Sequence, residues 1–571
     1  MEVVYFKMIK GDIVGEGAYG KVYLARESVN SPHSSITGAR YVVKRNIVEK
    51  EVDWAANLRE PDILLRLRGH PNIVKLERVI YGKPFESGRM SPTKEDYKDD
   101  KLHFVMEMGD LDLRDLIQNA NERKETSYED IKPIVVDVLL ALEYMHHNQI
   151  LHRDIKPGNI LIFLKSRGSS RPSDALDSST LNNDPDSSVT AKLCDFGLSK
   201  FYTKQEPQTP RMVTAWYRSP EIAMGAVNYD YKVDVWSLGC VIYEMLTGSA
   251  LVVVSRDENK RVLEQILRNL PERLPPKETK KLKELFDVKL PRGRKKAFIK
   301  VLFPEETRES FREIVGSPEV FTELVRSMLE FYPDNRPTIT QILDHEFFDD
   351  CRDKIDEVRG EWLKDGEYAC FEPEEKLITI ASSQERKWGV CMAFYFYNKN
   401  LEERLDWYKP RILFQAIDLF DRYLCYASDA ERTPLRESEH LETSALQSEH
   451  LEDGLLKVQV QTEVKFIACV YLSIKYFATF VTPPSYLDMC KRLFSIEGTE
   501  EFARVFEKEL LEKVFKYKVY RPTVFEYADL ADDELSSNDI MNLLMAYGNC
   551  EDKENMELGD LYKELREFRH S

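Results

Sequence analysis

The sequence predicts an α+β domain over residues 8–350, followed by a smaller all-α domain over residues 374–530. Three observations carry this prediction. The glycine-rich segment 13–23 is flanked by β-prone residues, the polar loop 151–159 follows an apolar helical run, and apolar residues recur at i, i+3 and i+4 in the last third of the chain. In addition, a chain of 571 residues is too long for a single hydrophobic core.

Composition indicates a globular protein, with 43% hydrophobic and 32% charged residues. The formal net charge of −18 argues against a nucleic acid as the main partner. We expect no membrane partner, because the sequence has neither a signal peptide nor an apolar run that spans a bilayer. The nine cysteines include no CxxC pair, so we expect reduced core residues such as Cys240 and Cys469 in an intracellular protein, cytoplasmic or nuclear or both.

The loop Leu151–Asn159, which reads LHRDIKPGN, brings a carboxylate, a cation and an amide close together in sequence. Transfer of a phosphoryl group needs these three groups. The carboxylate of Asp154 would accept the proton of an incoming hydroxyl, the ammonium of Lys156 would stabilise the phosphate, and the amide oxygen of Asn159 would bind a metal ion.

The segment Ile13–Tyr23, which reads IVGEGAYGKVY, has its glycines at positions 15, 17 and 20. Without a Cβ, a backbone N–H can approach phosphate oxygens closely. Dinucleotide-binding folds use similar glycines, but there a crossover helix follows, whereas here the apolar run Tyr41–Lys44 predicts another strand. We therefore expect a nucleotide triphosphate to contact Lys44 and the residues Val14, Gly15, Glu16, Gly17, Ala18, Tyr19, Gly20 and Val22.

The loop 151–159 closely resembles the catalytic loop of protein kinases, and Leu193–Gly197 (LCDFG) and Ser219–Glu221 (SPE) follow in the order found in that family. The resemblance implies a bilobal fold, with a small lobe over 8–108 and a large lobe over 109–350. It implies ATP and Mg²⁺ as the cosubstrate and metal. It also implies the following catalytic residues and metal ligands: Lys44, Asp154, Lys156 and Asn159 in catalysis, and Asn159 and Asp195 at the metal.

In a kinase, the strand lysine pairs with a glutamate of the following helix, which the sequence predicts over 53–67. The matching residue is Glu60, with Glu51 as a weaker alternative. Pro61 complicates this prediction, because a proline inside a helix loses one hydrogen bond and costs about 3 kcal/mol. Either the helix is kinked there or it begins afresh at Pro61.

The resemblance further implies a hinge at Glu107–Gly109, whose backbone, including that of Met108, would bind adenine. Asp112 would reach the ribose hydroxyls. Two structural roles are also implied: an ion pair between Glu221 and Arg336, and contacts from Asp234 to the backbone of the catalytic loop.

The segment Met212–Glu221 (MVTAWYRSPE) resembles the CMGC group of serine/threonine kinases, and cyclin-dependent kinases in particular. In that family the arginine matching Arg218 braces the pocket that favours proline after the target residue. Thr209 matches the activation-loop threonine. Its phosphate would bind the cations Arg59, Arg153 and Lys200.

A segment rich in Ser, Asp and Asn, residues 164–190, predicts a disordered insertion in the large lobe. Residues 353–373 are expected to be a linker, and residues 531–571 an acidic helical tail. A second, acidic insertion is expected over 427–458.

The stretch Leu413–Leu424 resembles the second helix of a cyclin box, and Phe466–Tyr476 resembles its central helix. One departure is Arg411, which occupies the position of a glutamate that cyclins present to their kinase. The resemblance implies a cyclin-dependent kinase fused to a cyclin-like domain. This domain would activate the kinase in cis for phosphorylation of Ser/Thr-Pro sites in proteins. The alternative is a scaffold or decoy, in which the domain recruits a separate kinase or the kinase part binds without turnover. A foreign cyclin or kinase is a further possible partner.

Overall fold

The computed structural model describes most of the first 368 residues and five segments beyond them. The described residues are 5–17, 20–28, 40–46, 53–81, 102–123, 130–165, 188–202, 213–270, 274–286, 288, 298–305, 308–364, 367–368, 377–380, 410–432, 466–467, 469–474 and 553–557. Among them, no helix is both long enough and apolar enough to cross a membrane.

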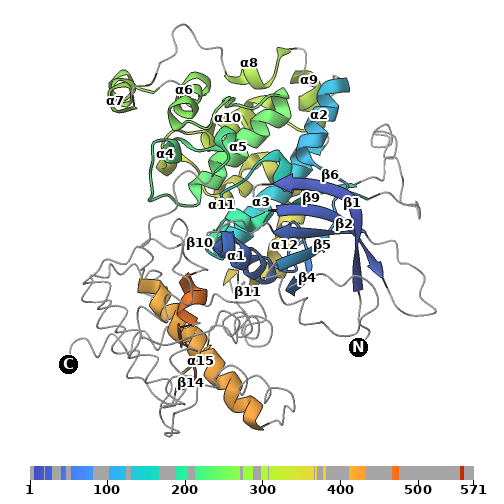
Figure 1. Cartoon of the computed structure of the whole chain (residues 1–571). Helices are drawn as coiled ribbons and strands as arrows, with labels where there is room; N and C mark the ends of the chain where they lie inside the picture. Colours follow the sequence, from blue (N-terminus) through green and yellow to red (C-terminus); the bar gives the residue numbers. More distant parts are fainter. Residues whose placement is uncertain are drawn as a thin grey trace.

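A five-stranded antiparallel sheet and one helix form the small lobe (Figure 1). The spatial order of the strands is β1-β2-β3-β5-β4, and the pairing of Gly17 with Gly20 closes the β1–β2 hairpin. The helix contacts the turn Phe196–Leu198 of the large lobe. The elements are β1 (Tyr5–Gly17), β2 (Gly20–Ser28), β3 (Arg40–Asn46), α1 (Asp53–Arg66), β4 (Leu76–Tyr81) and β5 (Leu102–Glu107).

The large lobe is mainly helical and is built around two buried helices, α3 (Ile131–His147) and α5 (Lys232–Thr247). Both are apolar on nearly all sides, which is the pattern of a helix enclosed by others. α5 ends at Thr247, and the next residue, Gly248, has a φ of 66° and donates its N–H to the Glu244 carbonyl at 2.8 Å. The other helices are α2 (Leu113–Arg123), α4 (Pro220–Ala223), α6 (Asn259–Asn269), α7 (Pro276–Phe286), α8 (Phe298–Leu302), α9 (Arg308–Ile314), α10 (Pro318–Met328), α11 (Ile339–Leu343) and α12 (Arg352–Trp362).

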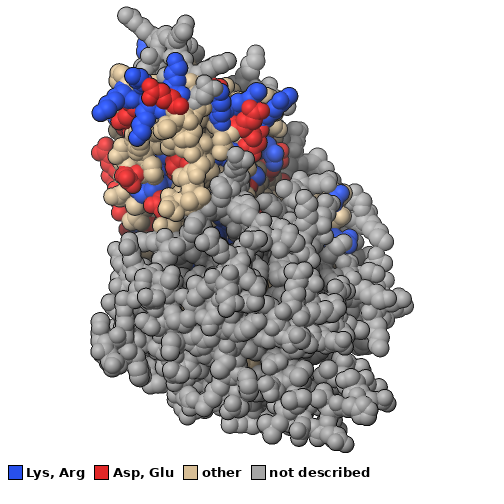
Figure 2. Space-filling model, turned by 60° about the vertical axis from the view of Figure 1, so that its left-hand side comes forward, with Lys and Arg blue, Asp and Glu red and all other residues tan. Residues whose placement is uncertain are grey.

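The large lobe also contains two small sheets. The strands β6 (Leu111–Asp112), β8 (Ile160–Lys165) and β9 (Ser188–Leu193) form one, and β7 (Ile150–Leu151) pairs with β10 (Lys200–Phe201) in the other. Charged side chains of both signs alternate over the described surface of the large lobe in the view of Figure 2.

The predicted insertion over 164–190 is shorter than expected at both ends. Residues 164–165 belong to β8 and residues 188–190 to β9, and these two strands pair with each other. Leu164 and Val189 pack against the core, which explains why the sheet extends into a polar segment. The rest of the insertion lies outside the described residues.

The predicted linker over 353–373 is also structured in its first part. Helix α12 occupies 352–362, and the strands β11 (Leu363–Lys364) and β12 (Glu367–Tyr368) form a hairpin directly after it. Burial of Ile355 against the large lobe accounts for the helix, because that side chain is inaccessible to solvent. The first part of the expected linker therefore forms a helix and a hairpin.

In the C-terminal part, the predicted helices are present where the structure describes it. Helix α15 (Pro410–Arg432) covers the first, and residues 466–467 and 469–474 are helical. Their apolar side chains belong to the same buried cluster as those of the kinase-like part. α15 extends into the predicted insertion at 427–458 as far as Arg432; the remainder of that insertion is not described.

Two short strands contradict the expectation of helices alone. β13 (Leu377–Ile380) pairs with β14 (Lys553–Glu557) in an antiparallel ladder. The predicted acidic helical tail therefore contains a strand at 553–557. The sequence KENME has little β-propensity of its own, so the pairing with an apolar partner strand decides its conformation.

Candidate active site

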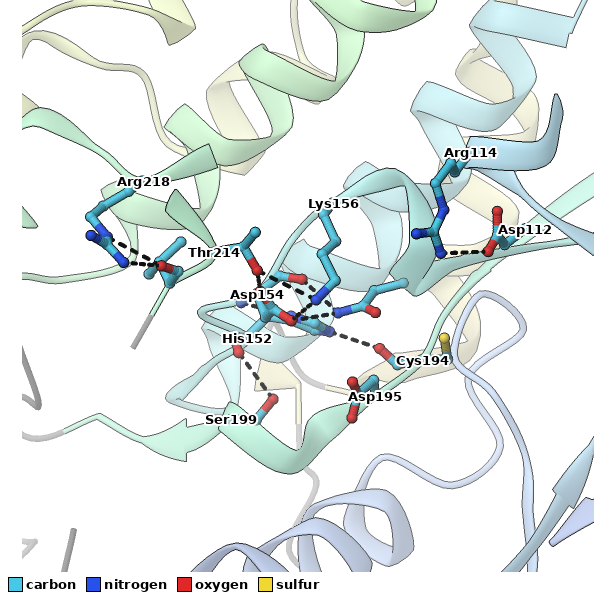
Figure 3. Close-up of polar contacts among 12 residues, drawn as sticks. Asp112, Arg114, His152, Asp154, Lys156, Cys194, Asp195, Ser199, Thr214 and Arg218 are labelled. Carbon is cyan, nitrogen blue, oxygen red and sulfur yellow. Dashed lines mark hydrogen bonds and ion pairs between the residues drawn. The ribbon is translucent and has the colours of Figure 1, made fainter. Parts of the chain in front are cut away.

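The carboxylate of Asp154 is the centre of a hydrogen-bond network in the catalytic loop (Figure 3). Lys156 donates from Nζ to Oδ2 at 2.5 Å, and Asn159 donates from Nδ2 to the same oxygen at 2.9 Å. The hydroxyl of Thr214 donates to Oδ1 at 2.6 Å. Asp154 is 3% exposed, so these donors fix the carboxylate in a nearly dry environment.

Lys44 lies between two carboxylates from distant parts of the chain. Its Nζ is 2.7 Å and 2.9 Å from the two carboxylate oxygens of Glu60 and 2.8 Å from Oδ1 of Asp195. α1 is continuous through Pro61, so the helix does not begin afresh at the proline. The expected contact between Lys44 and Glu60 is therefore present.

This arrangement determines the charge of the groups involved. Burial alone would lower the pKa of Lys44, but Asp195 and Glu60 raise it above its ordinary value. Burial alone would raise the pKa of Asp195, but the ion pair with Lys44 lowers it to about 2. At neutral pH the lysine is thus a cation and Asp195 an anion.

Asp195 lies two residues beyond the end of β9 and has a φ of 60°, in the left-handed region. This conformation costs a non-glycine residue about 1–3 kcal/mol, and such strain is concentrated at functional sites. It turns the carboxylate towards Lys44, and the Phe196 backbone N–H holds Glu60 on the other side of that lysine.

Asp234, at the start of α5, fixes the backbone of the catalytic loop by hydrogen bonds. Its carboxylate accepts the backbone N–H groups of His152 at 3.0 Å and Arg153 at 2.8 Å, and it contacts His146 Nε2 at 3.0 Å. Arg153 also has a positive φ, 66°. Burial lowers the pKa of His152, so this ring is neutral near pH 7 and adds no charge to the loop.

The predicted hinge residues are Glu107, the last residue of β5, and the two residues that follow it, before β6. Glu107 holds β5 to its neighbours, because its carboxylate accepts the backbone N–H of Lys75 at 2.6 Å and the ammonium of Lys192 at 2.8 Å and 2.9 Å. Met108 packs against the core. The sequence analysis did not predict the ion pair of Lys192 with Glu107, and neither the residue type nor the spacing of Lys192 indicates such a pair.

Asp112 has a structural role that the sequence reasoning did not consider. Its Oδ1 accepts the backbone N–H of Asp115 at 2.9 Å and thus caps α2, and Oδ2 pairs with Arg114 at 3.1 Å. Figure 3 shows this pair on one side of Asp154 and Arg218 on the other.

The glycine-rich segment forms the β1–β2 hairpin, which pairs with the strand that carries Lys44. The register places Gly15 opposite Val22 and pairs Val22 with Lys44 on β3. Val14 is exposed, and Gly20 is buried. The backbones of Glu16 and Gly17 belong to β1, while Ala18 and Tyr19 lie outside the described residues.

Arg218 is buried and bound on three sides. It donates to the Val213 carbonyl at 3.1 Å and 2.7 Å, to the Asp257 carboxylate at 2.6 Å and 3.1 Å, and to Asn259 Oδ1 at 2.7 Å. The sequence indicated Arg218 but not Asp257 or Asn259, which precede and begin α6. The predicted pair of Glu221 with Arg336 is also present, with both oxygens at 2.7 Å from the guanidinium.

The residues at the site fit Mg²⁺. In the described part of the chain, no three His, Cys, Asp or Glu side chains would hold a metal by themselves. Mg²⁺ sites that bind phosphates use one or two protein groups, and Asp195 with Asn159 meets this need. The Asp195 side chain is 37% exposed, and Asn159 donates through its amide nitrogen, so an oxygen of each is left for a cation.

The comparisons with known proteins agree with this geometry. The protein kinase domain model matches residues 8–348. The chain is 32% identical over 345 residues to the CTD kinase subunit alpha of Schizosaccharomyces pombe, with 59% of this chain and 48% of the relative covered. It is 33% identical over 242 residues to human cyclin-dependent kinase 10, with 42% and 54% covered.

A third relative is cyclin-dependent kinase G-1 of Oryza sativa subsp. indica, 29% identical over 350 residues, with 59% of this chain and 41% of the relative covered. The chain thus spans about half the length of the curated relatives it matches. Protein kinase domains of the cyclin-dependent type use ATP and Mg²⁺, for which the site described above has the required groups. On its fold, its site and these matches, the chain belongs to the protein kinase domain family.

Proposed function

We propose that this protein is a proline-directed serine/threonine kinase of the cyclin-dependent type, activated by its own C-terminal domain. The observation that carries the proposal is the network around Asp154, in which a buried carboxylate is oriented by Lys156, Asn159 and Thr214.

In the reaction, a substrate serine or threonine hydroxyl lies against Asp154, which orients it and accepts its proton. The hydroxyl oxygen attacks the γ-phosphorus of ATP, and the bond to the β,γ-bridging oxygen breaks. Lys156 stabilises charge on the transferred group, and Lys44, held by Glu60, binds the other phosphates. Mg²⁺ on Asn159 and Asp195 would neutralise charge on the phosphates.

Preference for proline after the target residue is supported by the contacts of Arg218. The guanidinium engages the Val213 carbonyl, which is therefore unable to accept an N–H from the substrate. A residue with an N–H at this position would leave that donor unpaired, at a cost of about 1–3 kcal/mol. Proline has no N–H and avoids the cost.

Activation by phosphorylation of Thr209 is supported by Arg153. Its Nε donates to the Leu198 carbonyl at 2.7 Å, while Nη1 and Nη2 are buried without a hydrogen-bond partner among the described residues. A phosphate would supply the acceptors that this guanidinium lacks. Thr209 itself lies outside the described residues.

Activation in cis is supported by the continuity of the buried apolar cluster between the kinase domain and the helices of the C-terminal part. In Figure 1, α15 lies below α1, the helix that carries Glu60. A tethered domain acts at an effective concentration of about millimolar for a short linker, so it needs no separate encounter.

Radiolabelled phosphate transfer to a peptide with a Ser-Pro site tests the catalytic part of the proposal. We expect Asp154→Asn to lower kcat by about 10²- to 10⁴-fold, because the general base is lost. Nucleotide binding, measured by calorimetry, should persist, which separates lost chemistry from lost folding. Wild-type activity in the Asn variant would contradict the role of Asp154.

The same assay with paired Ser-Pro and Ser-Ala peptides tests specificity. We expect the wild type to favour the Ser-Pro peptide by about tenfold or more in kcat/KM, the equivalent of about 1.4 kcal/mol. Asp257→Ala, which removes the main anionic partner of Arg218, should reduce this ratio. Equal rates on both peptides in the wild type would refute proline direction.

A further inference from the structure

Helix α12 lies beyond residue 348, where the match to the kinase family ends, yet it is firmly attached to the large lobe. Arg359 donates to the two carboxylate oxygens of Glu143 at 2.7 Å and 2.9 Å. Lys354 pairs with Asp137 at 2.6 Å. Both acidic residues are buried on α3, so these contacts fix the position and direction of α12.

At the end of α12, Trp362 contacts the loop that follows α1 in the small lobe. A Cβ added to Gly69, which has a φ of 103°, would lie 3.0 Å from the indole ring. The ring of His70 is stacked on Tyr144 with 4.9 Å between centroids, and its centroid is 5.7 Å from that of Trp362. The loop is thus held between α3 and α12.

The same loop is hydrogen-bonded to β9. Asn72 donates from Nδ2 to the Ala191 carbonyl at 3.1 Å, and its own carbonyl accepts the N–H of Leu193 at 2.9 Å. Val74 donates to the Leu193 carbonyl at 2.9 Å. Asp195 is two residues beyond Leu193. The loop, by fixing the position of Leu193, therefore also helps to fix the position of the Asp195 backbone.

α12 reaches β9 by a second route. Asp137, the partner of Lys354, accepts the N–H of Ala191 at 2.8 Å. α12 is therefore linked to β9 by two sets of contacts. One set runs through α3, and the other runs through the loop 69–74.

We propose that α12 is a clamp outside the matched kinase domain that positions β9, and with it Asp195, and that Trp362 is the positioning residue of this clamp. Its consequence for catalysis rests on the proposed function, whereas the clamp itself does not. Since α12 leads directly into β11 and the C-terminal part, the clamp also provides a physical connection from that part to the active site.

Trp362 itself offers a matched pair of variants. Its indole N–H is buried without a hydrogen-bond partner in the described part of the chain. Trp362→Phe keeps an aromatic ring against His70 and removes this unsatisfied donor, while Trp362→Ala removes the ring. Glu357, exposed on the same helix, gives the control Glu357→Ala.

Hydrogen exchange of the full-length protein, without ligands, tests the clamp. In Trp362→Ala, we expect the amides of Val74 and Leu193 to exchange about tenfold faster than in the wild type, with smaller effects in α5. Trp362→Phe should restore most of the protection, and Glu357→Ala should match the wild type.

Wild-type exchange at Val74 and Leu193 in Trp362→Ala would overturn the proposal. If Trp362→Ala does not fold, the Trp362→Phe variant decides. We then expect amide exchange in Trp362→Phe to be faster than in the wild type only within residues 69–76 and 188–196. A uniform increase in exchange over the whole protein would overturn the proposal. Peptide phosphorylation is measured in parallel, with about a tenfold lower kcat expected for Trp362→Ala. A wild type without activity would refute the proposed function and leave the exchange result to decide on the clamp.

Discussion

Buried polar residues with defined partners dominate the site at the scale of single residues. Lys44 contacts two carboxylates, and the carboxylate of Asp154 accepts hydrogen bonds from three donors, all at hydrogen-bond distances. Each group is therefore oriented before any substrate binds. Such preorganisation contributes to catalysis because little reorganisation is needed during the reaction. His70 differs from these residues, because its buried ring packs against Tyr144 and Trp362 and takes no part in the described hydrogen-bond network of the site.

Burial lowers the pKa of His70 from 6.5 to about 3. The unfolded chain therefore takes up a proton below about pH 6.5 that the folded protein does not, and stability falls as the pH decreases from about 6.5 to about 3. We expect His70→Gln to reduce the slope of unfolding free energy against pH by about 1.4 kcal/mol per pH unit between pH 5.5 and 4.

Urea unfolding at several pH values measures this slope. His152, whose pKa burial also lowers, is present in both proteins and cancels in the comparison. Equal slopes for the variant and the wild type would show that His70 is not buried as a neutral ring.

At the scale of elements, three different elements each position one part of the site. The start of α5 supports the catalytic loop, α1 carries the partner of Lys44, and β9 delivers Asp195. The contact between α5 and the loop is the most buried of these, because Asp234 is inaccessible to solvent and satisfies two backbone N–H groups.

Asp234→Ala would leave the N–H groups of His152 and Arg153 without their acceptors in a buried place. We expect a loss of about 2–5 kcal/mol of unfolding free energy. Chemical unfolding followed by circular dichroism measures it, with the exposed Asp356→Ala on α12 as the control. A loss as small as that of the control would mean that the loop is held by other contacts.

At the scale of the whole molecule, the apolar cluster continues from the kinase domain into the helices α15 and 466–474. If the C-terminal part activates the kinase within the same chain, activity per molecule is independent of protein concentration. Activation between molecules would instead increase with concentration.

We expect the specific activity of the full-length protein to stay constant from nanomolar to micromolar concentrations, because tethering gives an effective concentration of about millimolar. Initial rates of peptide phosphorylation measure it. In the same experiment, a fragment of residues 1–368, which keeps α12 and the β11–β12 hairpin, should be less active than the full chain at every concentration. A folded fragment with full activity would exclude activation in cis.

The sequence by itself determined the groups that lie close together along the chain. The loop 151–159 fixes the spacing of Asp154, Lys156 and Asn159, and the alternation of β-prone residues and glycines fixes the β1–β2 hairpin, because both depend on local chain geometry. Periodicity likewise located α15.

Only the tertiary structure decided the contacts between distant segments. Pro61 left the partner of Lys44 open in the sequence, but the packing of α1 places Glu60 there. Thr214 lies within the motif 212–221, but its hydrogen bond to Asp154 joins segments 60 residues apart, and Asp257 lies in no motif. α12 lies in what reads as a linker, and β14 forms because a distant strand is available to pair with it. Local patterns encode which residues lie close along the chain, whereas these contacts depend on burial and pairing between segments far apart in sequence.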